Sequence, residues 1–159
     1  MLFRSQRILG YFIEEAKEHL ETLERGILDL PSVAKDAEKI NEMFRAAHSL
    51  KGGAAMLGYS SIQKTAHRLE DVFKILQEQE VTADQKLVSL FLAEYDTLRD
   101  LLEMLQSPFG FENSNAEAIL EREEPIFQEL QSYLGQLLPG EFREEPVAQL
   151  DTEVASRTL

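Results

Sequence analysis

The sequence predicts an all-α protein, built as an antiparallel up-down four-helix bundle with an additional C-terminal helix. Apolar residues recur every three or four positions through most of the 159 residues, which is the spacing of one buried helix face. The segments with this spacing are separated by only a few residues each, and helices joined by short connections pack as antiparallel neighbours. The chain also contains only eight Gly and five Pro, as expected for a protein composed mainly of helix.

The first two helices are delimited by breaker residues. The first is expected at about 7–30, with Pro31 helping to end it because proline lacks the N–H that a helix interior requires. The second is expected at about 36–57 and ends at Gly58, a residue type favoured just past a helix C-terminus.

The next two helices begin at patterns of the capping-box type, in which a hydroxyl residue precedes Gln by three positions. The third helix is expected from Ser60 to about residue 78, with Ser60-x-x-Gln63 at its start. The fourth is expected from Thr82-x-x-Gln85 to about residue 105, where a Ser-Pro pair follows.

The end of the chain has a weaker pattern. After a turn at 109–111, a fifth helix is expected at about 115–138, broken or restarted at Pro125, with an apolar stripe that packs outside the bundle. Residues 1–138 are therefore expected to form one domain. Residues 139–159 combine charges and prolines without periodicity, so a flexible linker or tail is expected there.

Composition excludes several classes of function. The formal net charge of −13 argues against nucleic acid and anionic membranes as partners, since both attract Lys and Arg. The absence of cysteine excludes disulfides and thiolate chemistry. No apolar run approaches the roughly 18 residues of a membrane span, and the N-terminus lacks a signal-peptide core. A monomeric, cytoplasmic module without membrane insertion is expected.

The most informative segment is FRAAHSLKGGAAMLG at 44–58, with His48 at its centre. The buried face of this helix passes through Ala47, which places His48 on the outer face together with Gly52. Gly52 and Gly53 each cost about 1 kcal/mol relative to Ala in a helix interior. Bare backbone beside an exposed imidazole suggests that another protein must reach the ring.

The charge around this histidine differs from the rest of the chain. Residues 41–75 carry five basic and three acidic side chains, although the whole chain is strongly acidic. Such a local field tolerates an anion, for example a phosphoryl group, near His48. Chance clustering of charges on a solvated face is the alternative.

The third helix brings complementary groups to the same place. Lys51 lies one turn after His48, and His67 and Glu70 are i, i+3 partners off the apolar face of the third helix. Because the second and third helices are antiparallel neighbours, a carboxylate and a second imidazole are available to His48 across their seam. A histidine nucleophile attacks through one ring nitrogen while the other holds the proton, and Glu70 can fix that tautomer. Lys51 can screen charge on phosphoryl oxygens.

Two simpler interpretations remain open for these residues. His67 with Glu70 can be a routine helix-surface pair, worth a few tenths of a kcal/mol. A metal site is the other, but bundles with two bridged metals use Glu-x-x-His on two helices, whereas His67-x-x-Glu70 has the reverse order and occurs once. No metal is therefore expected.

The segment 44–58 resembles the signature of histidine phosphotransfer (HPt) domains, in which an exposed histidine is followed by Ser or Thr, an apolar residue, Lys and Gly. TAHRLEDVFKIL, which contains His67 and Glu70, is similar to the N-terminal phosphotransfer domain of CheA-type chemotaxis histidine kinases. This resemblance implies that His48 accepts phosphate from ATP held by a separate kinase domain. Glu70 would then hydrogen-bond the other ring nitrogen, and Lys51 and His67 would complete the network.

The resemblance also implies the partners. The phosphoryl group would pass to an aspartate of a response-regulator receiver domain, and Arg45, Gly52 and Lys74 are the residues expected to dock partners. The chain has no Gly-rich phosphate loop, so ATP and Mg²⁺ are expected on the kinase domain, and this chain is a carrier that is not catalytic alone. The expected context is the N-terminal part of a chemotaxis-like kinase. The alternative is a helical interaction or adaptor module without phosphorylation.

Overall fold

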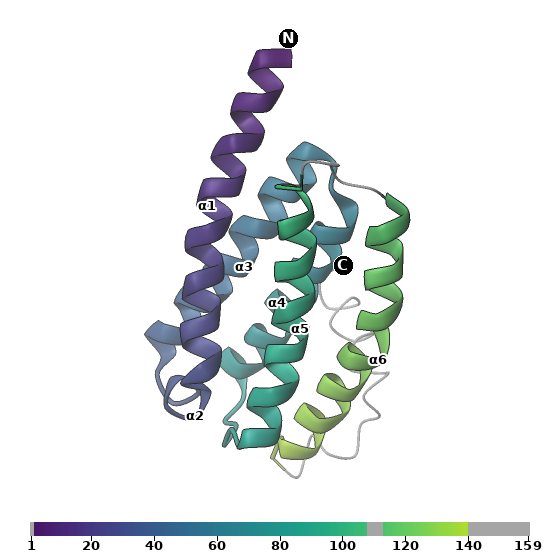
Figure 1. Ribbon diagram of the computed structural model, residues 1–159. Coiled ribbons are helices and arrows are strands. Elements are labelled where there is room, and N and C mark those ends of the chain that lie inside the picture. The colour runs from purple at the N-terminus through teal and green to yellow at the C-terminus, as the bar shows by residue number, and fades with distance from the viewer. Residues whose placement is uncertain (1, 108–112, 140–159) are drawn as a thin grey trace, which may run out of the picture.

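The computed structural model describes residues 2–107 and 113–139, and these residues are helical apart from short turns (Figure 1). Within those ranges there is no strand, which confirms the predicted all-α class. The helices in chain order are α1 (Leu2–Leu28), α2 (Leu30–Val33), α3 (Ala37–Leu57), α4 (Ser60–Glu78), α5 (Gln85–Met104) and α6 (Asn113–Leu137). None of the helices described is long and apolar enough to cross a membrane.

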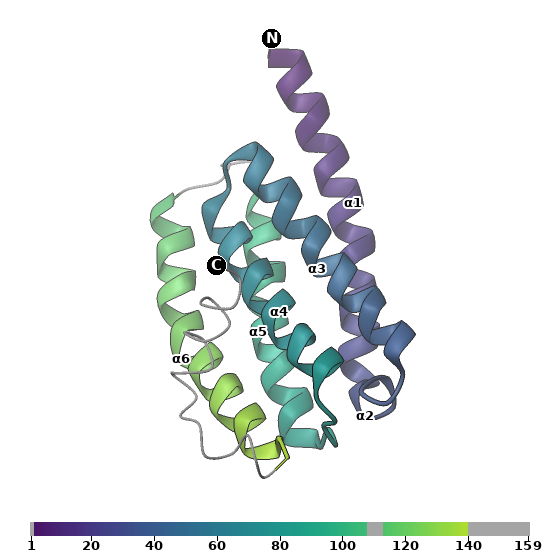
Figure 2. The same ribbon diagram turned by 180° about the vertical axis from the view of Figure 1, so that it is seen from behind.

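Four long helices form the predicted up-down bundle. α1 packs on α3, α3 on α4, α4 on α5, and α5 back on α1, while α6 lies outside against α5 and α4 (Figures 1 and 2). Fully buried side chains from all four helices fill the centre, and the rings of Phe73 and Phe91 stack there with centroids 5.6 Å apart. The N-terminal part of α1 projects beyond the end of the bundle.

The connection between the first two long helices differs from the sequence prediction. α1 ends at Leu28, and Leu30 and Pro31 belong to the separate short helix α2. Pro31 therefore lies in the first turn of a helix rather than ending one. Proline is well suited to that position because the first-turn N–H groups have no partner within the helix, and its fixed φ angle is already helical.

The caps of α4 and α5 also differ from the predicted capping boxes. α4 does begin at Ser60, but its N-cap residue is Tyr59 and no side chain caps it. α5 begins at Gln85, three residues after Thr82, and the carboxylate of Asp84 accepts a hydrogen bond from the Leu87 N–H at 2.9 Å. A carboxylate immediately before the helix thus provides the cap in place of the Thr82 hydroxyl.

Both ends of α3 are fixed by local chemistry, and the glycine at the C-terminal end is the one the sequence predicts. The Asp36 side chain accepts hydrogen bonds from the N–H groups of Glu38 and Lys39. At the other end Gly58 adopts φ 83°, the left-handed conformation in which a side chain is strained, and the Tyr59 N–H returns to the Ala54 carbonyl. Because α4 starts directly afterwards, this turn sets how α4 lies against α3.

The fifth predicted helix is α6, and it continues through Pro125 rather than breaking there. α6 bends about half-way along its length (Figure 1), as expected where proline removes a backbone hydrogen bond from a helix interior. The turn predicted at 109–111 and all but the first residue of the predicted tail at 139–159 lie outside the described residues.

The two adjacent glycines of α3 have different surroundings. A Cβ on Gly53 would come within 2.7 Å of the Phe12 ring of α1, so Gly53 allows α1 and α3 to pack closely. A Cβ on Gly52 would meet nothing within 4 Å. Helix packing therefore explains why position 53 has no side chain. Gly52, beside His48, has open space around it, so packing does not explain the glycine at that position.

This difference predicts opposite effects of one substitution. Gly52→Ala should raise the free energy of unfolding by about 1 kcal/mol through helix propensity. Gly53→Ala gains the same propensity but must displace the Phe12 ring, and overpacking costs about 1–3 kcal/mol, so it should be neutral to destabilising. Urea denaturation of the two variants measures the difference, and equal stabilisation by both would contradict the packing role of Gly53.

Candidate functional site

His48 lies on the outer face of α3 with 63% of its side chain exposed. Its neighbours along the helix, Ala47 and Leu50, are buried in the core and fix the rotation of α3. The predicted exposure of the imidazole on the outer face of this amphipathic helix is thus confirmed. A ring in this position can be reached by another protein without any unfolding of the bundle.

A single carboxylate from α4 joins His48 and Lys51. The Nδ1 of His48 lies 2.5 Å from Oε2 of Glu70, and the Nζ of Lys51 donates to Oε1 of Glu70 at 2.7 Å. Both oxygens of Glu70 therefore have a partner on α3. Three of the four side chains that the sequence assigns to this seam, His48, Lys51 and Glu70, are thus brought together as predicted.

Glu70 is an ionised group in a largely buried position, with only 10% of its side chain exposed. Burial alone would raise the pKa of Glu70, but hydrogen bonds from Lys51 and His48, and the positive charge of Lys51, hold its pKa below the ordinary value. Glu70 thus remains a carboxylate at neutral pH. In this form it can accept a hydrogen bond from a protonated Nδ1 of His48, but it has no proton to donate to that nitrogen.

This contact determines which nitrogen of His48 is reactive. A neutral imidazole carries one N–H, and a carboxylate acceptor at Nδ1 holds that proton there. The lone pair is then on Nε2, the nitrogen on the far side of the ring from Glu70. The site therefore presents a nucleophilic Nε2, with its tautomer fixed from α4.

Phe44 is a further member of the site. Its half-buried ring lies one turn before His48 and nearly parallel to the imidazole, with centroids 6.2 Å apart and planes inclined by 10°. Phe44 and Glu70 together restrict the orientation of the exposed ring. The i, i+4 spacing from His48 is the sequence signal that indicates this contact.

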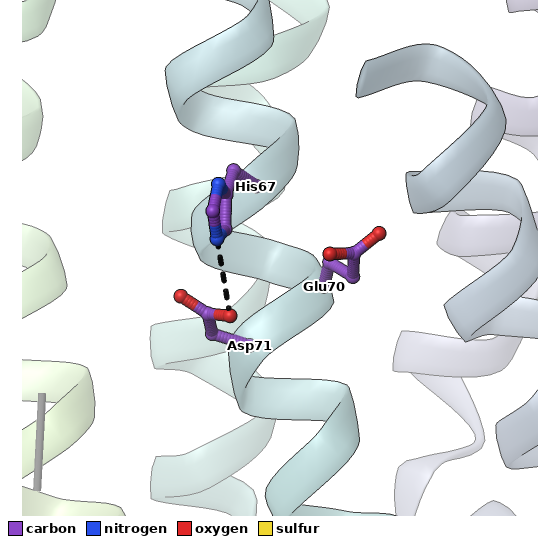
Figure 3. A group of neighbouring side chains, drawn as sticks. All are labelled: His67, Glu70 and Asp71. Carbon is purple, nitrogen blue, oxygen red and sulfur yellow. Dashed lines mark ion pairs between the residues drawn. The ribbon is translucent and has the colours of Figure 1, made fainter. Parts of the chain in front are cut away.

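His67 is oriented differently from the other predicted members of the site. Its Nε2 pairs with Oδ1 of Asp71 at 3.3 Å, one turn along α4, and 54% of the His67 side chain is exposed. Figure 3 shows His67 and Asp71 on one side of α4 and the Glu70 carboxylate turned to the other side. The predicted pairing of His67 with Glu70 is therefore replaced by an i, i+4 pair with Asp71, which the sequence analysis did not single out.

The group His67, Glu70 and Asp71 has the residue types of a cation site, with ligand atoms all within 4.8 Å of one another. However, both oxygens of Glu70 already have partners on α3. Glu70 is therefore engaged with α3, while His67 and Asp71 pair with each other on α4.

The residues expected to dock partners line the same seam. Arg45 and Gly52 are exposed on α3, one turn before and one turn after His48, and Lys74 is half-buried on α4, one turn after Glu70. A hydrogen bond of 2.5 Å between Gln77 and Asn41 marks the seam further along, so Arg45 and Lys74 occupy positions between that bond and the His48–Glu70 contact. With Lys51, the seam thus carries three basic residues beside an exposed imidazole.

The family model of the Hpt domain matches residues 7–107, which include all of these residues. The chain belongs to the Hpt domain family. Among curated proteins this Hpt domain is similar to the chemotaxis protein CheA of Klebsiella aerogenes, with 39% identity over 92 residues, and to that of Borreliella burgdorferi, with 34% over 100 residues. These matches cover 58% and 63% of this chain and only 14% and 12% of the relatives.

Solved structures show the same fold. The phosphorylated P1 domain of CheA3, solved in complex with CheY6 from R. sphaeroides, has a TM-score of 0.61 at 26% identity. That match covers 78% of this Hpt domain and 98% of the other chain. The CheA phosphotransferase domain from Thermotoga maritima has a TM-score of 0.55 at 35% identity, covering 62% and 94%.

The geometry predicts the tautomer of His48. In the neutral form, nitrogen-15 NMR should find the His48 proton on Nδ1, with His19 as an internal reference, and Glu70→Ala should move that proton predominantly to Nε2, because the acceptor is lost. The same tautomer in both proteins would show that Glu70 does not hold the proton.

Proposed function

We propose that this Hpt domain carries a phosphoryl group between two partner domains through His48. The observation that supports this most directly is the exposed imidazole whose Nδ1 is held by the Glu70 carboxylate. Its relatives are CheA chemotaxis proteins, and the chain spans about one seventh of their length. The proposal therefore includes a context in which the domain is the phosphoacceptor part of a larger cytoplasmic chemotaxis-type kinase.

In the first step the lone pair of Nε2 attacks the γ-phosphorus of ATP held with Mg²⁺ by a kinase catalytic domain. The Nε2–P bond forms, the bond from phosphorus to the oxygen of ADP breaks, and the imidazole becomes positively charged. The proton stays on Nδ1, where the ionised Glu70 stabilises the imidazolium charge at 2.5 Å. Nothing in this step requires this chain to bind the nucleotide.

In the second step an aspartate carboxylate of a receiver domain attacks the same phosphorus. The Nε2–P bond breaks, its electron pair returns to the imidazole, and His48 is again neutral with the proton on Nδ1. Because His48 projects from the surface, donor and acceptor can approach it in turn from the same side. The solved complex of a related P1 domain with CheY6 supports a receiver domain as the acceptor.

The remaining residues have supporting roles in the proposal. Lys51 keeps Glu70 ionised, and its ammonium group lies close enough to His48 to reduce repulsion from phosphoryl oxygens. His67 pairs with Asp71 on the other side of α4 from the Glu70 carboxylate, so it takes no direct part in this network. Arg45 and Lys74 favour acidic partner surfaces, and Gly52 leaves room for them beside the ring.

The phosphoacceptor can be identified by substitution. The full chain incubated with a CheA-type kinase domain and γ-labelled ATP should acquire acid-labile phosphate, and His48→Gln should abolish it because, within the described residues, no other imidazole has its Nδ1 held by a carboxylate. His19→Gln, a histidine of α1, should label as the wild type does. Equal labelling of His48→Gln, with its helical circular dichroism intact, would refute the proposal.

The role of Glu70 gives a rate prediction. Glu70→Gln removes the charge that stabilises the imidazolium, so phosphorylation of His48 should slow by a factor on the order of 10² to 10⁴. Glu78→Gln is a matched control, since it makes the same change at an exposed position on the same helix. Rapid-quench measurement of labelling compares the two, and equal rates would remove Glu70 from the mechanism.

A further inference from the structure

A second cluster of charged side chains is buried where α6 packs on α4 and α5. The Nη1 of Arg68, on α4, donates to both oxygens of Glu123 at 2.7 and 2.8 Å, and its Nη2 contacts Glu124 at 2.8 Å. The guanidinium lies 4.4 Å above the centre of the Phe127 ring. None of these residues belongs to the phosphotransfer site, and α6 lies outside the region matched by the Hpt model.

Glu94 of α5 is the unusual member of this cluster. Glu94 and Glu123 are both fully buried, with exposed fractions of 0%. Neither oxygen of Glu94 accepts a hydrogen bond from any N–H or O–H group in the described part of the chain. An ionised carboxylate buried without a donor is strongly disfavoured, so the neutral, protonated carboxyl is the form that fits this environment.

The charge balance of the cluster leads to the same conclusion. Arg68 is the cation acting on Glu94, and it is already paired with Glu123 and Glu124 of α6. Burial first, and then the hydrogen bond and negative charge of Glu123, raise the pKa of Glu94 to about 10, which Arg68 opposes and Glu124 reinforces. On the α1 side of α5, Glu24 acts on the neighbouring Tyr95.

We propose that Glu94 and Glu123 form a proton-binding site that locks α6 onto the four-helix bundle. Glu94 carries the proton and donates it to one oxygen of Glu123, and Glu123 also accepts from Arg68. One shared proton thus connects α5 to α6, and one guanidinium connects α6 to α4. This inference goes beyond phosphoryl transfer and is independent of it.

The proton shared by Glu94 and Glu123 makes the docking of α6 onto the bundle depend on pH. When α6 leaves the bundle, Glu94 becomes solvated and its pKa returns to the ordinary range, so the proton is released at neutral pH. The docked state then binds one more proton than the undocked state. Docking is fully favoured below the ordinary pKa of Glu and weakens by about tenfold per pH unit as pH rises toward the raised value.

The test compares the full chain with its Glu94→Gln variant, whose amide keeps the shape and the hydrogen-bond donor without the proton. Hydrogen exchange of α6 amides is measured between pH 6 and 9, and the variant-to-wild-type ratio of protection factors removes the intrinsic pH dependence of exchange. This ratio should rise by about tenfold per pH unit in α6 and stay constant in α3.

Glu124→Gln is the matched control. It lies on the same helix and contacts the same Arg68, but its side chain is 44% exposed, so it should keep the pH dependence of the wild type. A constant ratio in α6 for Glu94→Gln would overturn the proton site. A parallel rise of the ratio in α3 and α6 would overturn the claim that the shared proton holds α6 on the bundle, because it would mean that the whole bundle opens together.

A second measurement does not depend on exchange. At pH 7 the infrared spectrum of the wild type should contain the C=O stretch of a protonated carboxylic acid, which Glu94→Gln removes and Glu124→Gln retains. Absence of this band from the wild type would also overturn the proposal.

Discussion

The functional site depends on one carboxylate that crosses from α4 to α3. Glu70 accepts from His48 with one oxygen and from Lys51 with the other, so it fixes a tautomer, orients an exposed ring and holds a cation beside it. Each of these effects requires Glu70 of α4 to lie level with His48 of α3 along the helix axes. The left-handed turn at Gly58, with α4 beginning two residues later, fixes the position of α4 along α3. A backbone conformation available mainly to glycine thus determines the chemistry of a histidine ten positions away.

The features that could be predicted from the sequence are those determined by local spacing. Apolar periodicity places His48 on the outside of α3, and the short connection at Gly58 places Glu70 opposite it, so the central contact follows from residues close in the chain. Helix ends were less predictable because several polar residues compete for each cap, and at α5 the Asp84 carboxylate provides the cap in place of Thr82. The partner of His67 was misassigned because Glu70 and Asp71 both lie within one helical turn of it, and only tertiary packing turns Glu70 toward α3.

The contacts that hold α6 lay beyond any local pattern. Arg68 and Glu123 are 55 residues apart, and no periodicity in the sequence indicates that they pair. The sequence around Glu94 likewise does not indicate that this carboxyl group is fully buried under α6. α4 is consequently bound on two sides by ionic groups, to α3 through Glu70 and to α6 through Arg68. A carboxylate of low exposure lies at each of these two places. Glu70 accepts from two donors and stays ionised, whereas Glu94, next to the Arg68–Glu123 pair, lacks a donor and keeps its proton. The same residue type therefore serves as an anion at the site and as a proton carrier at the α6 interface.

The central claim is that Glu70 holds Nδ1 of His48 and leaves Nε2 as the nucleophile. The most direct test is to identify the phosphorylated nitrogen in the phosphoprotein by coupling between phosphorus-31 and nitrogen-15 in NMR spectra of labelled protein. A coupling to Nε2, with the proton still on Nδ1, is the predicted result. Phosphorus bonded to Nδ1 would contradict the claim, since that nitrogen could not remain hydrogen-bonded to Glu70 at 2.5 Å while it carried the phosphoryl group.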